Sequence, residues 1–413
     1  MVAGYMKSFG LLYMYIQQYY PNSSTTGGGW MLGLLSGCRG LLAPMIGMLM
    51  VRLGPRVCSV CGGLVTALGI LLALPATSIL HLAVTLGALV GLGLSMSETP
   101  GFIIISEYFE ERRATANGFR ASGNPSGGVV FPFIMVFLCS EFPLMGVFML
   151  LAGIMLQICI LGMLLRPFHI HQKIVQQEYK NSLVSSTHAV QKRNDFQENS
   201  SFKLNNLPKK RKALQLSFLK NPVFLVYIVL IICTNAGLQN VMFYLILYGT
   251  SIGLSGAENS IIVAFLSILD VFARMFIGYI SDTKYVKKRH VFTLGHVVAG
   301  LSMLMVPLTK SLGTLLSVVW LHALGVAAFW ALINTLLADQ FGETTLSTTW
   351  GFVRMVQGIT SFAYPPFLGW LSDVSEWMGM PFLFIGCMYI MGSLVFALQP
   401  LVMRLSGIKV PLT

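Results

Sequence analysis

Apolar segments of roughly 20 residues recur along the whole length of this chain, and no other feature limits its fold so strongly. A helix of that length, rising about 1.5 Å per residue, crosses the ~30 Å hydrocarbon core of a bilayer. Charged residues make up only 10% of the sequence, whereas soluble domains average about 25%. The chain is therefore predicted to be an all-α polytopic membrane protein.

Twelve spans are predicted, each ended by a Gly, a Pro or a charged residue. The first begins at Met1, contains Lys7 and is barely long enough to cross, so we expect a first helix that lacks its N-terminal half. The basic region and the small-residue cleavage site of a signal peptide are missing. The predicted spans cover residues 1–20, 30–51, 56–76, 79–105, 113–139, 143–166, 222–249, 258–281, 290–309, 311–337, 347–371 and 380–403.

The positive charges alternate from one side of the predicted spans to the other. Of the 27 Lys and Arg residues, 21 lie in alternate connections or in the C-terminal tail, and only Lys310 lies on the opposite side. Basic residues concentrate on the cytoplasmic side of membrane proteins. We therefore expect both termini of the complete chain to be cytoplasmic. The net charge of +12 then reflects topology, and no nucleic-acid partner is needed to explain it.

A polar segment at 167–220 interrupts the apolar pattern. It is rich in Gln, Asn, Ser and Lys and cannot bury enough apolar surface to fold alone. We predict a six-helix bundle over 1–166, a largely disordered cytoplasmic loop over 167–220, and a second six-helix bundle with a short tail over 221–413. The basic cluster at 208–212 fits a nuclear-localisation signal, but beside a span it favours contact with anionic lipid.

Corresponding connections of the two halves carry a similar loop. One runs from Gly47 to Arg56 after the second span, and the other from Gly278 to Asp282 after the eighth, followed by basic residues. Both resemble the loop of the major facilitator superfamily, in which Gly lets helices approach closely and charges form cytoplasmic latches. Val51 stands where that pattern has Asp, so the first latch is expected to be weaker.

A second resemblance is more specific. The segment 108–118, Tyr-Phe-Glu-Glu-Arg-Arg-Ala-Thr-Ala-Asn-Gly, resembles the signature of the monocarboxylate transporter family, and residues 339–373 resemble that family's tenth to twelfth spans. The resemblance implies a major facilitator fold of 6+6 helices around a central cavity, at the plasma membrane. It also implies small monocarboxylates and protons as solutes, and a possible single-span immunoglobulin-type chaperone. The family's usual opening of the first span is absent.

Asp270 and Arg274 are the strongest candidates for transport chemistry. Their i, i+4 spacing places both on one face of the eighth span. An isolated charge at the bilayer centre costs about 2.5–3.5 kcal/mol on insertion scales, so each is expected to neutralise the other. The pair is either a static structural bridge or a switch in which Asp270 takes a proton and Arg274 holds a substrate carboxylate. The resemblance implies the second role.

Other charged residues are candidates for the transport site or for structural roles. The resemblance implies that Lys7 assists proton and carboxylate capture, although a snorkelling residue near the chain end is the alternative. Glu98 and Arg120, on consecutive spans, either form a second buried ion pair or repolarise the cavity. Arg39 and Arg354 lie within spans, but nothing in the sequence fixes their direction. Gating or structural roles are expected for residues at span boundaries: Arg112, Arg113, Gly118 and Asp282.

No enzyme motif has convincing spacing in this sequence. Cys58 and Cys61 match a metal or redox spacing, but a second pair is missing, so no metal or other cofactor is predicted. The leading hypothesis is proton-coupled symport of small monocarboxylates such as lactate or pyruvate. The alternatives are facilitated transport of a larger carboxylate, such as an aromatic amino acid, and a truncated form that does not transport.

Overall fold

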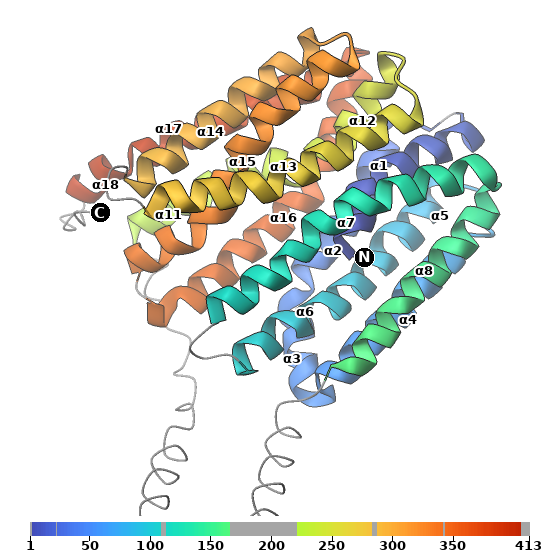
Figure 1. Cartoon of the computed structure of the whole chain (residues 1–413), viewed down its shortest axis with the longest axis horizontal. Helices are drawn as coiled ribbons and strands as arrows, with labels where there is room; N and C mark the ends of the chain where they lie inside the picture. The colour runs from blue at the N-terminus through green and yellow to red at the C-terminus, as the bar shows by residue number, and fades with distance from the viewer. Residues whose placement is uncertain are drawn as a thin grey trace, which may run out of the picture.

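A computed structural model describes residues 2–21, 23–108, 113–165, 221–282, 287–341 and 343–405, and every regular element within these residues is helical. Figure 1 shows long helices running side by side as one elongated bundle. The helices before the central segment are α1 (Val2–Tyr19), α2 (Thr25–Leu41), α3 (Ala43–Leu53), α4 (Pro55–Leu71), α5 (Ile79–Leu82), the π-helical η1 (Ala83–Leu89), α6 (Val90–Tyr108), α7 (Arg113–Glu141) and α8 (Leu144–Leu164).

The second set of helices follows the same pattern of long, nearly continuous elements. Several predicted spans are broken once, as between α11 and α12, where residues 239–240 separate two helices. The elements are α11 (Pro222–Leu238), α12 (Val241–Ser251), α13 (Gly256–Asp282), α14 (Lys288–Met305), the 3-10 helix η3 (Val306–Leu308), α15 (Leu312–Phe341), α16 (Glu343–Ser375), α17 (Met380–Ala397) and α18 (Gln399–Leu405). The domain boundaries at 166 and 221 stay predictions, because residues 166–220 lie outside the described part.

Local chemistry explains several helix ends. Asn221 caps α11 by accepting a hydrogen bond from the Val223 amide at 2.9 Å, with Pro222 at the first helical position. Ser255 and Glu258 form a reciprocal capping box at the start of α13, in which the Ser255 amide donates to Glu258 at 2.8 Å. Gly54 separates α3 from α4 with a φ of 84°, a conformation that glycine adopts readily.

Seven helical stretches are long and apolar enough to cross a membrane: Ile79–Gly101, Leu144–Leu164, Pro222–Ser251, Gly256–Ile280, Lys288–Leu308, Leu312–Phe341 and Met380–Arg404. The other five predicted spans are also helical, but they fall short of that measure. Four of them, α1, α2, α7 and α16, pack against one another or against α12 and α13. Helices that face other helices can carry Gly and charged residues that lipid would not tolerate.

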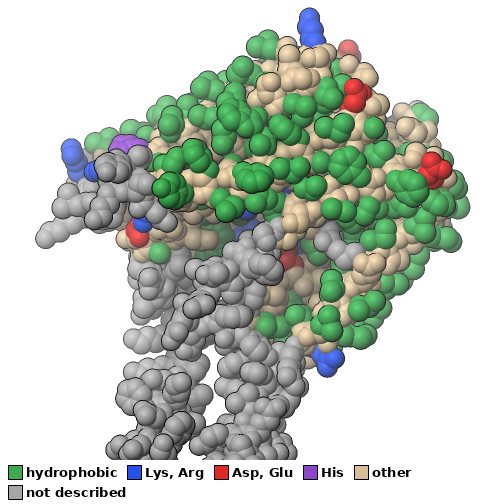
Figure 2. Space-filling model, in the orientation of Figure 1, with side chains coloured by type: hydrophobic (Ala, Val, Ile, Leu, Met, Phe, Trp, Pro, Cys, Tyr) green, Lys and Arg blue, Asp and Glu red, His purple; other side chains and the backbone are tan. Residues whose placement is uncertain are grey.

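Apolar side chains face outward from the bundle. On α13 the residues Phe272, Met275 and Tyr279 are each more than half exposed and share one face of the helix. Figure 2 shows hydrophobic side chains spread over the visible face of the bundle. Exposed apolar area of this extent marks a surface made for lipid.

The two sets of helices meet most closely where α2 packs along α16. A Cβ at Gly40 would lie 2.6 Å from the Cα of Gly358, and one at Gly29 would overlap the Pro365 carbonyl. Small residues at such positions let two helix backbones approach without lost packing. This contact therefore depends on glycine.

One end of the α2–α16 contact is closed by a carboxylate. Asp373 of α16 accepts hydrogen bonds from the amides of Thr25 and Thr26, at 3.0 and 2.8 Å, and thus caps the first turn of α2 from the other half of the chain. The contact continues along α2, because Gly40 near its other end lies against Gly358 of α16.

We predict that Gly29→Ala will lower the melting temperature of the purified protein, because the added methyl group must push α2 away from α16. Overpacking of this kind costs about 1–3 kcal/mol. The matched control is Gly153→Ala on α8, where a Cβ meets nothing within 4 Å in the described part. Equal melting temperatures for the two variants would contradict the close contact.

Candidate functional site

Asp270 and Arg274 form a two-pronged ion pair on α13. The Arg274 Nε donates to Oδ1 of Asp270 at 2.6 Å, and Nη2 donates to Oδ2 at 2.7 Å. The guanidinium also lies 5.5 Å from the ring centroid of Trp330 on α15, within range of a cation–π contact. The Asp270 side chain is 10% exposed and that of Arg274 is 28% exposed. The carboxylate is thus buried while its cation stays within reach of a solute.

Lys7 reaches the same carboxylate from the other half of the chain. Its Nζ lies 3.8 Å from Oδ2 of Asp270 and donates to the Ser267 hydroxyl at 3.1 Å. The structure thus brings Lys7 together with the pair of Asp270 and Arg274. Gly128 on α7 makes room for this reach, since a Cβ there would lie 2.6 Å from Cδ of Lys7.

Ser267 is a member of this cluster that the sequence analysis missed. Helical spacing contained the signal, because Ser267 precedes Asp270 by three residues and Arg274 by seven and so shares their face. The opposite face of α13 carries the exposed Phe272, Met275 and Tyr279. One helix therefore offers an apolar face to lipid and a charged face to the other half.

The charges of the cluster do not cancel. Lys7 and Arg274 supply two positive charges and Asp270 supplies one negative charge, so the group carries a net charge of about +1 when all three are ionised. In a partly buried site a charge interacts more strongly than in water. The cluster is built to attract an anion.

A second polar site lies between α2, α6 and α16. It is a cavity of about 260 Å³ lined by Arg39 and Glu98 on one side and by Arg354 on the other. The Nε of Arg39 lies 3.6 Å from Oε2 of Glu98, and Nη1 of Arg354 donates to Gln357 at 3.2 Å. The structure thus shows where Arg39 and Arg354 point, which the sequence left open.

The predicted ion pair of Glu98 with Arg120 stays a prediction, because the Arg120 side chain lies outside the described part of the chain. Arg39 is the cation that the described residues place beside Glu98. The rotation of α2 about its axis turns Arg39 toward α6. Sequence spacing alone does not give that rotation.

The predicted gating residues remain predictions. Arg112 lies outside the described residues. Arg113 and Gly118 lie in α7 and Asp282 ends α13, but their side chains are not among those described. Within the described residues, no group of three or more His, Cys, Asp or Glu side chains has the geometry of a metal site. Cys58 donates instead to the Met96 carbonyl at 3.6 Å.

Fold and site together define a polytopic helical membrane protein with a charged cluster shared between two sets of helices. The Major Facilitator Superfamily model matches residues 1–319. The chain belongs to this superfamily, and within it is a transporter of the monocarboxylate transporter kind. The all-α polytopic major facilitator fold predicted from the sequence is confirmed.

Curated relatives agree over most of the chain. Monocarboxylate transporter 12 of Xenopus laevis is 26% identical over 380 residues, covering 91% of this chain and 81% of that protein. Monocarboxylate transporter 2 of Mus musculus is 26% identical over 372 residues, covering 89% and 75%.

A solved structure supports the fold alone. A POT family transporter in complex with a thioalcohol-conjugated peptide matches with a TM-score of 0.70 and 14% identity, covering 97% of this chain and 94% of that one.

We predict that substitutions within the buried cluster will have non-additive effects on the free energy of unfolding. Asp270→Ala should be strongly destabilising, by about 3–5 kcal/mol, because it leaves Lys7 and Arg274 without their shared anion. Adding Arg274→Ala to it should cost less than the sum of the single changes. Thermal unfolding of the purified variants measures this.

The control is the more exposed pair of Lys288 and Asp339, whose side chains are 34% and 33% exposed at an N–O distance of 3.5 Å. Alanine at both positions should change stability by only about 0–1 kcal/mol. Additive losses at Asp270 and Arg274 would show that the two charges do not act as a unit.

Proposed function

We propose that this protein carries small monocarboxylates such as lactate or pyruvate together with protons, by alternating access. The observation that carries the proposal is the position of Asp270, held between Lys7 of one half and Arg274 of the other at 3.8 and 2.6 Å. A carboxylate shared by cations from both halves is suited to link protonation to the relative motion of the halves.

Protonation of Asp270 starts the cycle. A neutral carboxyl no longer holds the Arg274 guanidinium, whose planar fork then matches an incoming carboxylate. Lys7 adds a second positive charge beside it. Before loading, the cluster carries about +1, and after gaining one proton and one monocarboxylate anion it again carries about +1. Loaded and empty carriers thus meet similar electrostatic costs as the halves move.

A contact between the halves that can be released supports alternating access. Asp373 of α16 caps the first turn of α2, where the halves are in contact. The positive-inside pattern predicts that this end of α2 faces away from the cytoplasm. In this proposal the opposite state requires Asp373 to release Thr25 and Thr26. The plasma membrane as location and the single-span immunoglobulin-type chaperone remain predictions from the resemblance.

Asp270→Asn should remove the pH dependence of uptake. In the natural protein, uptake of a radiolabelled monocarboxylate should rise as the external pH falls, because a proton must first neutralise Asp270. In the variant an uncharged amide leaves Arg274 permanently available, so exchange of one substrate for another should survive while net uptake slows. Proteoliposomes assayed at acidic and alkaline external pH measure both.

Arg274→Lys is the matched variant. It keeps the charge but loses the fork, so uptake should fall about tenfold, the cost of one charge-assisted hydrogen bond, while the pH response persists.

An unchanged pH response in Asp270→Asn would move the coupling proton elsewhere, with Glu98 the next candidate. Surface protein that takes up no carboxylate at all would favour the non-transporting form.

The second cavity favours an alternative, a larger carboxylate such as an aromatic amino acid. Arg39 and Glu98 are separated by 3.6 Å with side chains 17% and 20% exposed, and no hydrogen bond joins them among the described contacts. Both groups can therefore accept a new partner. A solute with a carboxylate and an ammonium group would match this pair of opposite charges.

Glu98→Gln separates the two candidates. If the cavity holds an ammonium group, the variant should lose uptake of aromatic amino acids by about tenfold or more and leave lactate uptake unchanged. Glu141→Gln, at the exposed end of α7, serves as the control. A natural protein that transports lactate but no amino acid would remove the alternative.

A further inference from the structure

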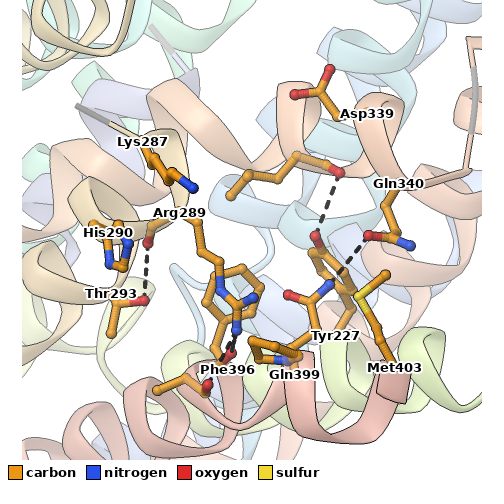
Figure 3. A pocket seen from close by; sticks show the side chains of 13 residues that line it. Tyr227, Lys287, Arg289, His290, Thr293, Asp339, Gln340, Phe396, Gln399 and Met403 are labelled. Carbon is orange, nitrogen blue, oxygen red and sulfur yellow. Dashed lines mark hydrogen bonds between the residues drawn. The ribbon is translucent and has the colours of Figure 1, made fainter. Parts of the chain in front are cut away.

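A cavity of about 330 Å³ lies at the end of the second set of helices, where α11 and α14 begin and α15 and α17 end. It is separate from the charged cluster of Lys7, Asp270 and Arg274, and the transport proposal does not use it. Figure 3 shows Lys287, Arg289 and His290, from the start of α14, on one side, and Tyr227, Gln340 and Gln399 on the other.

Arg289 is fixed in this cavity by the end of α17. Its Nη2 donates to the carbonyl oxygens of Phe396 at 2.8 Å and Ala397 at 3.2 Å, and its guanidinium lies 5.5 Å from the ring centroid of Phe396. These contacts use one edge of the guanidinium. Within the described part of the chain, the donors on Nε and Nη1 have no hydrogen-bond partner. A held guanidinium with unused donors is prepared to bind an oxyanion.

Lys287 supplies a second cation to this cavity. It is exposed at the cap position of α14, and its ammonium makes no ion pair with a described residue. The one carboxylate among the lining residues is Asp339, and Lys288 lies 3.5 Å from it. Lys287, Lys288 and Arg289 against Asp339 leave a net charge of about +2, with His290 neutral.

This net positive charge indicates the chemical class of the ligand. A phosphate monoester carries about −1.5 to −2 charges at pH 7 and offers several acceptor oxygens, whereas a monocarboxylate or a phosphodiester carries only about −1. Gln399 and Gln340, joined by a hydrogen bond of 3.3 Å, line the wall opposite Arg289 and add amide groups. The cavity suits a phosphate monoester on a polyhydroxylated group.

The position of the cavity relative to the membrane indicates which molecule would present the phosphate. The apolar span of α14 begins at Lys288 and that of α11 begins at Pro222, so the cavity lies at the edge of the membrane-crossing region. Basic residues make this the predicted cytoplasmic side, where basic pockets between helices bind phosphorylated lipid headgroups.

We propose that the cavity around Lys287 and Arg289 binds a phosphate monoester, presented by the headgroup of a phosphorylated inositol lipid. The ligand would bridge α14 to the α17 end through Arg289. It would thereby tie the cytoplasmic end of this helical set to the lipid around it.

The test measures lipid binding by the full chain in detergent micelles, by native mass spectrometry. The natural protein should retain phosphatidylinositol 4-phosphate in preference to phosphatidylinositol, which lacks the monoester. Lys287→Glu should weaken that binding about tenfold or more, the loss of one charge-assisted hydrogen bond. Lys310→Glu, an equally simple charge reversal at the opposite end, should leave it unchanged. Lys287 is exposed and makes no described side-chain contact, so the variant should fold.

Free inositol phosphate, added as a competitor, distinguishes the two sources of the phosphate. Weak competition supports the lipid headgroup, and competition as strong as by the lipid supports the same site with a soluble phosphate as its ligand. Equal retention of both lipids by the natural protein, or equal binding by Lys287→Glu and Lys310→Glu, would overturn the proposal.

Discussion

A charge placed inside a membrane must have a partner, and in this chain the partners of Asp270 come from both halves of the molecule. Arg274 holds the carboxylate with two hydrogen bonds, and Lys7 approaches it at 3.8 Å. Because unpaired charges in hydrocarbon are costly, α1 and α13 must lie with their polar faces together. The apolar face of α13 is then turned outward, to the lipid. One ion cluster therefore sets the rotation of two helices and forms the candidate site.

Close packing of α2 against α16 also holds the two halves of the molecule together. Glycines of α2 let it lie along α16, and Asp373 caps the first turn of α2 from α16. A hydrogen-bonded cap between two halves can break and re-form at modest cost, unlike a covalent link or a large apolar interface. A contact between the halves that can be released and re-formed is what the proposed alternating access requires.

The sequence contained the pattern of spans and the pair of Asp270 and Arg274, because both depend on periodicity along one helix. The resemblance implied a role for Lys7, and the structure places its Nζ 3.8 Å from Asp270. Contacts that depend on how two helices are rotated against each other were not predictable. The approach of Arg39 to Glu98 is such a contact. The spacing of Ser267 places it on the same helix face as Asp270 and Arg274, but it has no charge and was not selected as a candidate. Four of the five predicted spans that fall short in length or hydropathy, α1, α2, α7 and α16, lie where helices pack against helices.

The central claim is that one proton and one monocarboxylate anion load the cluster of Lys7, Asp270 and Arg274 without changing its total charge. Proteoliposomes on a supported membrane allow the transported charge and the flux of labelled monocarboxylate to be measured together. The account predicts flux driven by a proton gradient, with no net current and no dependence on membrane potential. A current that grows in proportion to the flux, or a flux indifferent to the proton gradient, would contradict it.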